Sequence, residues 1–408
     1  MTNALKMINT QKLMPIVFFI VFSLFFLFPN LGGVFIVLSV LFFGLHKRVT
    51  LNLYVTFIVL FFSGILATKS LYGEGNDFIT YYFNVLEGQY PTWSESKTDF
   101  FFWESISLIL KAIPNNDPFT FFWIVNIISF FPYILFFNYL SKIYGVTQTS
   151  KIASLFFILL LSSFSFWNLY GNYIRQAWVI TYFIGIIVLL IEKKRILALF
   201  FVVVVAMSHS TGILLLSIIP IYRLMHNFDM RKVAGVAILC LIITLVIPVS
   251  SLLDTVLPGY ISSKLNYYAS WDGSDFGGVA IIRVLVLSIG ALLFDSIIYK
   301  KLIPRSDIYK LMYFSLTLLV ITIALVSNIS KVVERLYYFV VLLFYIVISI
   351  QFVQIKEILV SNTKFVANLV MVYIGGGLIM YNLYSSLIYN PAYFDSNIIE
   401  FLTANFKL

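Results

Sequence analysis

A single arginine stands at the start of an otherwise apolar stretch, and it is the first candidate for chemistry in this sequence. Arg175 lies in the segment GNYIRQAW, residues 171–178, with Asn172 and Gln176 close by. A charged side chain at the edge of a membrane helix is costly and often marks a substrate path. Its planar guanidinium suits phosphate oxygens and stays charged at any relevant pH. The alternative is an arginine that only reaches the lipid headgroups.

A second charged pair opens a later apolar stretch. In KVVERLYYF, residues 331–339, Glu334 precedes Arg335 and Tyr337 follows. Arg335 could grip an anion while Glu334 orients it or contacts sugar. Glu334 could instead only mark a helix start, because acids are favoured at the positive end of a helix. Arg283 also falls near the predicted outer end of a span.

One histidine interrupts the stretch 196–222. The segment MSHSTG, residues 207–212, contains His209. This histidine either holds a helical hairpin together by hydrogen bonds or serves as a general base or phosphate contact, since histidine titrates near neutrality. The other two histidines are predicted on the inner side, and the single cysteine lies in an apolar run. No metal site is therefore expected.

Acidic and aromatic residues collect in the segments between apolar runs. LYGEGNDFITYYF, residues 71–83, carries Asp77 and Tyr81, and Glu104 lies in FWES. Carboxylates here could bind sugar hydroxyls or act as a base, and aromatic rings could stack on sugars. An ordinary solvated acidic loop is the alternative. The aromatic, glycine-rich segment 266–278 has the same character and is interpreted as a sugar-stacking or lid segment.

Helices must position these groups, because the composition is that of a membrane protein. Hydrophobic residues make up 61% of the 408 residues and charged residues 11%, against about 25% charged in soluble domains. The fold class expected is all-α, a polytopic integral membrane protein forming one domain over residues 1–408. The net charge of +9 sits mostly in short links, so it does not indicate nucleic acid. The 42 phenylalanines fit a lipid-facing surface.

About eleven spans are predicted from apolar runs, since a bilayer crossing needs roughly 20 apolar residues. They lie near residues 13–29, 31–45, 50–68, 119–140, 152–170, 173–191, 232–252, 279–299, 309–328, 335–355 and 365–388.

Lysines and arginines in the short links set the orientation, because they collect on the inner side. With the N-terminus inside, this bias holds along the whole chain only if 196–222 is a re-entrant hairpin that turns at Ser208–Thr211. Segments 69–118 and 253–278 then lie outside, as do the arginines at helix ends. Within 69–118, TDFFFWESISLILKAI has helical apolar spacing and predicts an amphipathic helix in the outer interface, ended by Pro114.

The order of these motifs resembles the EpsG-like branch of the Wzy-type polysaccharide polymerases, which is similar to the O-antigen polymerases. The motifs are GND…Y, an aromatic–glutamate pair, IRQ at the start of a span, SHS, and ERLYYF at the start of a late span. Each motif is short, and their order and placement carry the resemblance over most of the chain.

The resemblance implies a GT-C-like glycosyltransferase in the bacterial inner membrane that needs no cofactor and acts on its outer face. Its substrates would be undecaprenyl-pyrophosphate-linked oligosaccharides, and a chain-length regulator is a candidate partner. Arg175, Arg283 and Arg335 would clamp the pyrophosphate. His209, Asp77 or Glu104 would serve as base or position the acceptor, with Asn172, Gln176, Glu334, Tyr81 and Tyr337 as further substrate contacts.

Two other functions fit parts of the pattern. A flippase or other transporter should show two related halves and charges near the midplane, and neither is found in the sequence. A surface-glycan ligase would use the same lipid-linked donor and the same arginines, so the sequence separates it poorly from a polymerase.

Overall fold

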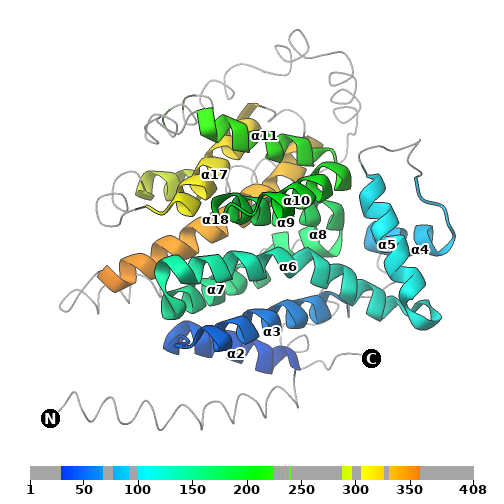
Figure 1. Ribbon diagram of the computed structural model, residues 1–408, viewed down its shortest axis with the longest axis horizontal. Coiled ribbons are helices and arrows are strands. Elements are labelled where there is room, and N and C mark those ends of the chain that lie inside the picture. Colours follow the sequence, from blue (N-terminus) through cyan, green and yellow to red (C-terminus); the bar gives the residue numbers. More distant parts are fainter. Residues whose placement is uncertain are drawn as a thin grey trace. The chain divides into compact units, whose positions relative to one another are not determined.

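The computed structural model describes residues 29–67, 77–91, 99–224, 287–295, 305–325 and 330–358, with two isolated helical positions, Gly235 and Leu239. Apart from turns, these residues are helical. The helices are α2 (Pro29–Phe43), α3 (Arg48–Ala67), α4 (Asp77–Leu86), α5 (Phe100–Ala112), η1 (Pro114–Asn116), α6 (Pro118–Tyr144), α7 (Val146–Leu161), α8 (Phe164–Gly171), α9 (Ile174–Ile191), α10 (Arg195–Ser208), α11 (Thr211–Leu224), α17 (Asp307–Leu325) and α18 (Ser330–Ile358) (Figure 1).

Five of the described helices are long and apolar enough to cross a bilayer. They lie at Arg48–Ala67, Pro118–Tyr144, Ile174–Ile191, Asp307–Ala324 and Val332–Ile355. Four shorter apolar helices accompany them. The predicted fold class is confirmed: the chain is an all-helical polytopic membrane protein.

The spans predicted near 31–45, 50–68, 119–140, 173–191, 309–328 and 335–355 match helices whose bounds differ from them by at most about five residues. Of the span predicted over 279–299, only residues 287–295 are described, and they are helical. One predicted span differs from the structure. The span predicted over 152–170 is wrong as a single helix, because α7 ends at Leu161 and α8 begins at Phe164. The hydroxyl of Ser163 accepts a hydrogen bond from the N–H of Phe166, which caps the new helix. Apolar content concealed this break. The spans predicted over 13–29, 232–252 and 365–388 and the outer segment 253–278 lie outside the described residues, apart from the two isolated positions.

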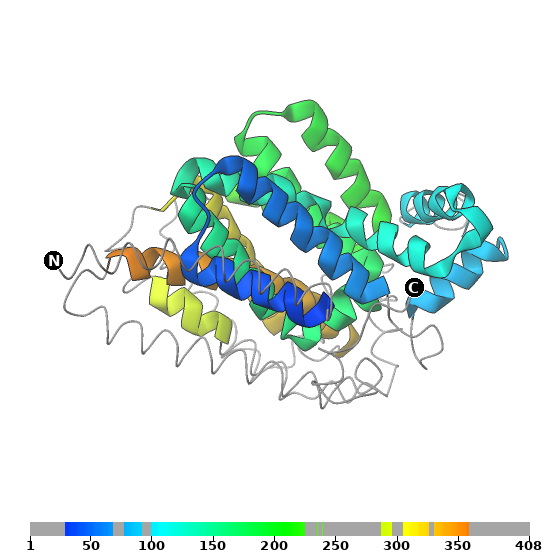
Figure 2. The ribbon, with the colours of Figure 1, turned by 90° about the horizontal axis from the view of Figure 1, so that it is seen from below.

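The described residues fall into two compact units. Helix α5 is divided between them after Phe102. The first unit contains α2 to α4, the rest of α5, and α6 to α8. The second unit contains the first turn of α5 together with α9, α10, α11, α17 and α18. In the first unit α3 packs on α6 and α2 packs on α7. Helices α2 and α3, drawn in blue, both extend from the short connection that joins them, so the chain reverses its direction there (Figure 2). Each unit is a helix-on-helix assembly that buries its own apolar faces.

Phenylalanine rings form much of the first unit's core. The ring of Phe62 stacks on Phe157 with centroids 5.3 Å apart, and Phe130 stacks on Tyr170 at 4.3 Å. The hydroxyls of Tyr133 and Tyr170 bond to each other at 2.7 Å, so these buried polar tips are satisfied. The expectation that phenylalanine marks lipid-facing surface is therefore incomplete, since several of these rings are fully buried.

Helix boundaries in the first unit follow local chemistry. Asp117 caps α6 by accepting a hydrogen bond from the N–H of Thr120 at 2.8 Å, and Pro118 occupies the first helical position. This bonding lowers the pKa of the Asp117 carboxyl. At the other end Gly145 has φ of 79°, a value that glycine adopts without strain, and α7 follows at once.

The predicted break in 196–222 is confirmed: α10 ends at Ser208 and α11 begins at Thr211. Each helix has 14 residues, a length of about 21 Å, which is shorter than the roughly 30 Å of a hydrocarbon core. Gly212 lets the two helices meet, because a Cβ there would lie 2.0 Å from the carbonyl oxygen of Val205. The lengths favour a hairpin, and its return to the inner face stays a prediction.

Candidate functional site

A short break separates α8 from α9 and places Arg175 at the head of α9. Asn172 ends α8, and the N–H groups of Asn172 and Tyr173 both bond to the carbonyl of Asn168, at 2.9 and 2.8 Å. The carboxamide of Asn172 also donates to the side chain of Asn168 at 3.0 Å. The GN pair in GNYIRQAW is thus a helix ending, and α9 starts afresh at Ile174.

Helix α9, in which Arg175 is the second residue, is shielded from lipid by the protein. Of its 18 residues 83% are buried. The apolar stretch of α18 has the same buried share, whereas that of α6 is 50% buried. An arginine that snorkels to headgroups is expected on a lipid-facing helix. Burial of α9 therefore argues against that explanation for Arg175.

Arg175 forms an ion pair that the sequence did not indicate. Its Nη1 donates to Oδ2 of Asp99 at 2.7 Å, and the side chains are 25% and 20% exposed. Asp99 immediately precedes α5 and lies 76 positions away along the chain. A pair with this much exposure to water contributes about 1 kcal/mol or less. This ion pair by itself stabilises the position of the guanidinium only weakly.

Next to Arg175, the carboxamide of Gln176 is buried. Gln176 is 2% exposed, and within the described part of the chain its Oε1 has no hydrogen-bond partner. The same holds for Nε1 of Trp178, two residues further on, and for Oγ of Ser208 at the end of α10. Buried polar atoms are normally bonded to protein or to ordered water. These three atoms are suited to contacts with a polar ligand or with water.

His209 lies between the two helices of the hairpin and is 6% exposed. Its Nδ1 accepts the backbone N–H of Thr211 at 3.3 Å and lies 3.0 Å from the Thr211 hydroxyl. A ring nitrogen that accepts a hydrogen bond carries no proton, so neutral His209 has its proton on Nε2. The ring therefore does hold the turn, as one interpretation predicted. In this arrangement Nε2 is a donor, which suits an anion better than it suits a general base.

The second predicted arginine lies near the start of α18. Glu334 is buried, whereas Arg335 and Tyr337 are half-buried. The ring of Tyr337 packs edge-on against Tyr338 with centroids 5.5 Å apart. Arg335 resembles Arg175 in part: Arg175 is the second residue of α9 and Arg335 the sixth of α18, and the apolar stretch of each helix is 83% buried. The helix dipole favours an anion at Arg175, in the first turn, more than at Arg335.

The predicted acceptor residues belong to the first unit. Asp77 is the first residue of α4, a helix that the sequence reading did not find, and Glu104 is half-buried on α5. The ring of Tyr81 packs edge-on against Trp103 at 5.2 Å, and Tyr90 stacks on the same indole at 6.2 Å. Tyr81 is therefore part of a buried aromatic cluster, and stacking of its ring on a sugar has no support in this arrangement.

The amphipathic helix predicted from TDFFFWESISLILKAI is confirmed as α5, and Pro114 follows its end. Its apolar stripe is buried in the protein: Phe102, Ile106, Leu110 and Ile113 are at most 7% exposed. Among the large apolar side chains of α5, only Leu108, at 64%, is strongly exposed. Its placement in the membrane interface stays a prediction.

The structure brings some of the predicted residues into defined contacts and leaves others as predictions. Arg175 meets Asp99, and His209 meets Thr211. Arg283 lies outside the described residues. A shared anion site formed by Arg175, His209 and Arg335, all in the second unit, stays a prediction. Among the described residues no cluster of three His, Cys, Asp or Glu side chains could hold a metal ion.

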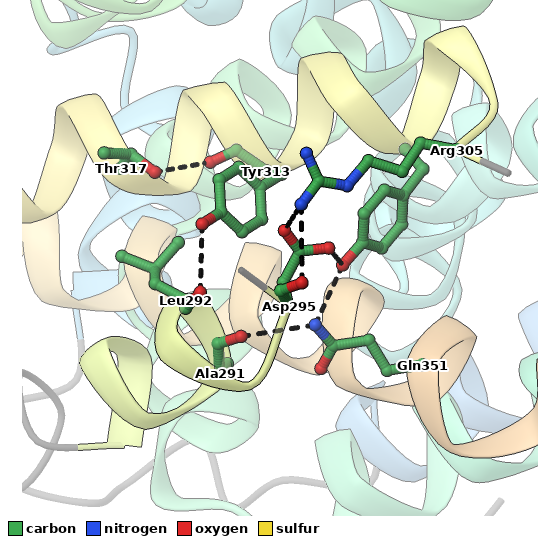
Figure 3. Close-up of polar contacts among 8 residues, drawn as sticks. Ala291, Leu292, Asp295, Arg305, Tyr313, Thr317 and Gln351 are labelled. Carbon is green, nitrogen blue, oxygen red and sulfur yellow. Dashed lines mark hydrogen bonds and ion pairs between the residues drawn. The ribbon is translucent and has the colours of Figure 1, made fainter. Parts of the chain in front are cut away.

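A buried polar network in the second unit escaped the sequence reading (Figure 3). Arg305 pairs with Asp295, and their side chains are 9% and 0% exposed. The hydroxyl of Tyr309 donates to Oδ1 of Asp295 at 2.8 Å and accepts from Nε2 of Gln351 at 2.8 Å. Arg305 also lies 5.5 Å from the ring centre of Tyr313. The network joins the helical segment 287–295, α17 and α18.

This geometry defines a class of protein: a polytopic, all-helical membrane protein with arginines in the first two turns of two buried helices. Comparison with family models matches the EpsG family over residues 52–391, well over half of the chain. The chain belongs to the EpsG family. No curated protein and no solved structure matches it. Membership indicates a membrane protein of polysaccharide-polymerase type.

Proposed function

We propose that this protein is a glycosyltransferase that joins lipid-linked oligosaccharide repeat units on the outer face of the bacterial inner membrane. The donor is the growing chain on undecaprenyl pyrophosphate. A hydroxyl of the incoming unit attacks C1 of the donor's reducing-end sugar, a new glycosidic bond forms, and the C1–O bond to pyrophosphate breaks. The proton of the hydroxyl passes to water, and undecaprenyl pyrophosphate leaves with the bonding electron pair.

The observation that carries this proposal is Arg175 at the head of α9. Its guanidinium is one-quarter exposed, so a ligand can reach it, and the helix behind it is buried and apolar. A fixed cation with a helix N-terminus favours an anion in a setting where screening by water is reduced. Stabilising the pyrophosphate as it leaves lowers the barrier for breaking the C1–O bond.

Neighbouring groups extend this anion site in the proposal. His209 would donate from Nε2 to a phosphate oxygen, in keeping with the hydrogen bonds on Nδ1. Arg335 would supply a second guanidinium, and the buried Oε1 of Gln176 would accept a sugar hydroxyl. Positioning of both substrates can lower the barrier by about 7–11 kcal/mol at best. Asp77 and Glu104 stay candidates for holding the acceptor.

Charge repulsion disfavours the binding of a carboxylate and a pyrophosphate to Arg175 at the same time. Two like unit charges 4 Å apart repel by about 1 kcal/mol in water and about 4 kcal/mol at an effective dielectric constant of 20. A pyrophosphate diester carries two negative charges, so the repulsion from a carboxylate at that distance is larger still. It exceeds the roughly 1 kcal/mol by which a partly exposed ion pair is stabilised.

The test is the glycan profile of a strain that lacks this protein. A polymerase predicts that chains of several repeats disappear while single units on lipid or core remain. Accumulation of lipid-linked repeats only on the inner face would instead identify a transporter. Retention of long chains on the lipid carrier, without transfer to a final acceptor, would identify a ligase.

A further inference from the structure

The carboxylate of Asp99 occupies the guanidinium that the proposed function assigns to pyrophosphate. Oδ2 of Asp99 lies 2.7 Å from Nη1 of Arg175. We propose that Asp99 is an internal competitor for the donor: it pairs with Arg175 until the pyrophosphate takes its place, and so it sets the affinity for the donor. This inference rests on the proposed function and adds a residue that regulates it.

Replacement of the Asp99 carboxylate by the pyrophosphate is favoured over binding of both groups to Arg175 at once. A carboxylate kept at Arg175 cancels the charge that attracts the pyrophosphate and repels the phosphate oxygens directly. Both side chains of the pair are partly exposed, so water can solvate the carboxylate when it leaves. The contact is also a single bond between Nη1 and Oδ2, whereas a pyrophosphate offers several oxygens to the planar fork of an arginine.

The helix dipole of α5 favours the charge of Asp99 whether or not it is paired with Arg175. Asp99 directly precedes Phe100, the first residue of α5. A carboxylate at this position is stabilised by the partial positive charge at the start of the helix. Loss of the contact with Arg175 therefore does not leave the charge of Asp99 without stabilisation.

The exchange does not require α5 to move. Its first turn is anchored within the second unit by two aromatic contacts. The ring of Phe101 meets Phe200 of α10 at 6.5 Å, and the ring of Phe102 meets Trp178 of α9 at 5.1 Å, both edge-on. These contacts hold the backbone beside α9 whether or not the carboxylate is paired. The competitor thus stays within reach of Arg175 and can return after the product leaves.

Binding of a short-chain polyprenyl pyrophosphate to the full-length protein in nanodiscs tests the inference. We expect Asp99→Asn and Asp99→Ser to bind this probe at least about fivefold more tightly than the wild type, because each removes a negative charge close to the anion. Binding of the matching polyprenyl alcohol, which lacks the pyrophosphate, should not change. Asp307→Asn is the matched control, since it removes the acid of an exposed ion pair with Lys310 on α17.

The Arg175→Ala variant distinguishes a failure of this inference from a failure of the proposed function. If Arg175→Ala loses binding and the Asp99 variants bind no more tightly than the wild type, Asp99 is not a competitor. If Arg175→Ala binds the probe as the wild type does, the pyrophosphate site itself is misplaced and the proposed function loses its main support. Tightening by both Asp99 variants, abolished when Arg175→Ala is added, is the result that the inference requires.

Discussion

Two arginines of the second unit form ion pairs with aspartates, in contrasting surroundings. Arg305 and Asp295 are 9% and 0% exposed, and Asp295 also accepts a hydrogen bond from Tyr309. Arg175 and Asp99 are 25% and 20% exposed, and a single contact between side-chain atoms defines their pair. The network around the first pair joins three helical segments through Tyr309 and Gln351, whereas the second pair joins the head of α9 to the residue before α5.

The contrast separates a structural ion pair from an exchangeable one. A buried pair cannot release one partner without leaving an unpaired charge in a medium of low dielectric constant. A partly exposed pair loses little when water or another anion replaces one partner. The same two residue types therefore fix helices in one place and can bind ligand in the other, and burial decides between these roles.

The largest expected effect is on the buried pair. Arg305→Ala should destabilise the protein by about 3–5 kcal/mol, because it leaves the buried carboxylate of Asp295 without the positive charge of Arg305. Loss of the exposed pair in Asp99→Ala should cost about 1 kcal/mol or less. Unfolding of the two variants in the same detergent, followed by circular dichroism, measures the difference. Equal destabilisation by both substitutions would contradict the claim that the buried ion pair contributes more to stability than the exposed one.

A smaller loss of stability is expected at the hairpin, where α10 and α11 approach closely at Gly212. Gly212→Ala places a methyl group where a Cβ would lie 2.0 Å from the carbonyl oxygen of Val205. Overpacking of this kind costs about 1–3 kcal/mol. The unfolding midpoint should fall, whereas Gly88→Ala, at a site with nothing within 4 Å, should show only the strain of its positive φ. A variant at 212 as stable as the wild type would contradict the close approach of α10 and α11.

The smallest effect concerns a third aspartate, Asp117, which caps α6. Asp117→Ala should cost about 1 kcal/mol through loss of the cap on α6. Hydrogen bonding to Thr120 lowers the pKa of Asp117, so its contribution is present above the unfolded pKa of about 3.9 and is lost as the pH falls through the lower folded value. The stability difference between wild type and variant should shrink below that pH. A difference that does not change with pH would show that the carboxylate is not the cap.

Much of the fold could be predicted from the sequence, because apolar length and helix breakers are local properties. The span predicted at 173–191 matches Ile174–Ile191, and the break at Ser208–Thr211 was placed by its polar residues and by the charge bias of the links. The break between α7 and α8 was missed, since two serines in an apolar run carry little signal until their capping contacts are known.

The partners of the charged residues could not be predicted. Arg175 was singled out because its charge is exceptional in its surroundings, a property of the sequence alone. Its contact with Asp99 spans 76 positions, and the contact between Gln351 and Tyr309 spans 42. Such pairs depend on how helices pack. Asp295 lies inside a predicted span, and a buried acid in an apolar helix requires a partner that the sequence alone does not identify.

The most direct test of the central claim is the glycan chain length in a strain whose only copy carries Arg175→Ala, with the amount of folded protein in the membrane measured alongside. The account predicts wild-type protein levels and at least about a 100-fold loss of polymer, because a group that stabilises transition-state charge is removed. Single repeat units should remain. A normal ladder of long chains at equal protein level would contradict the assignment of Arg175 to the pyrophosphate.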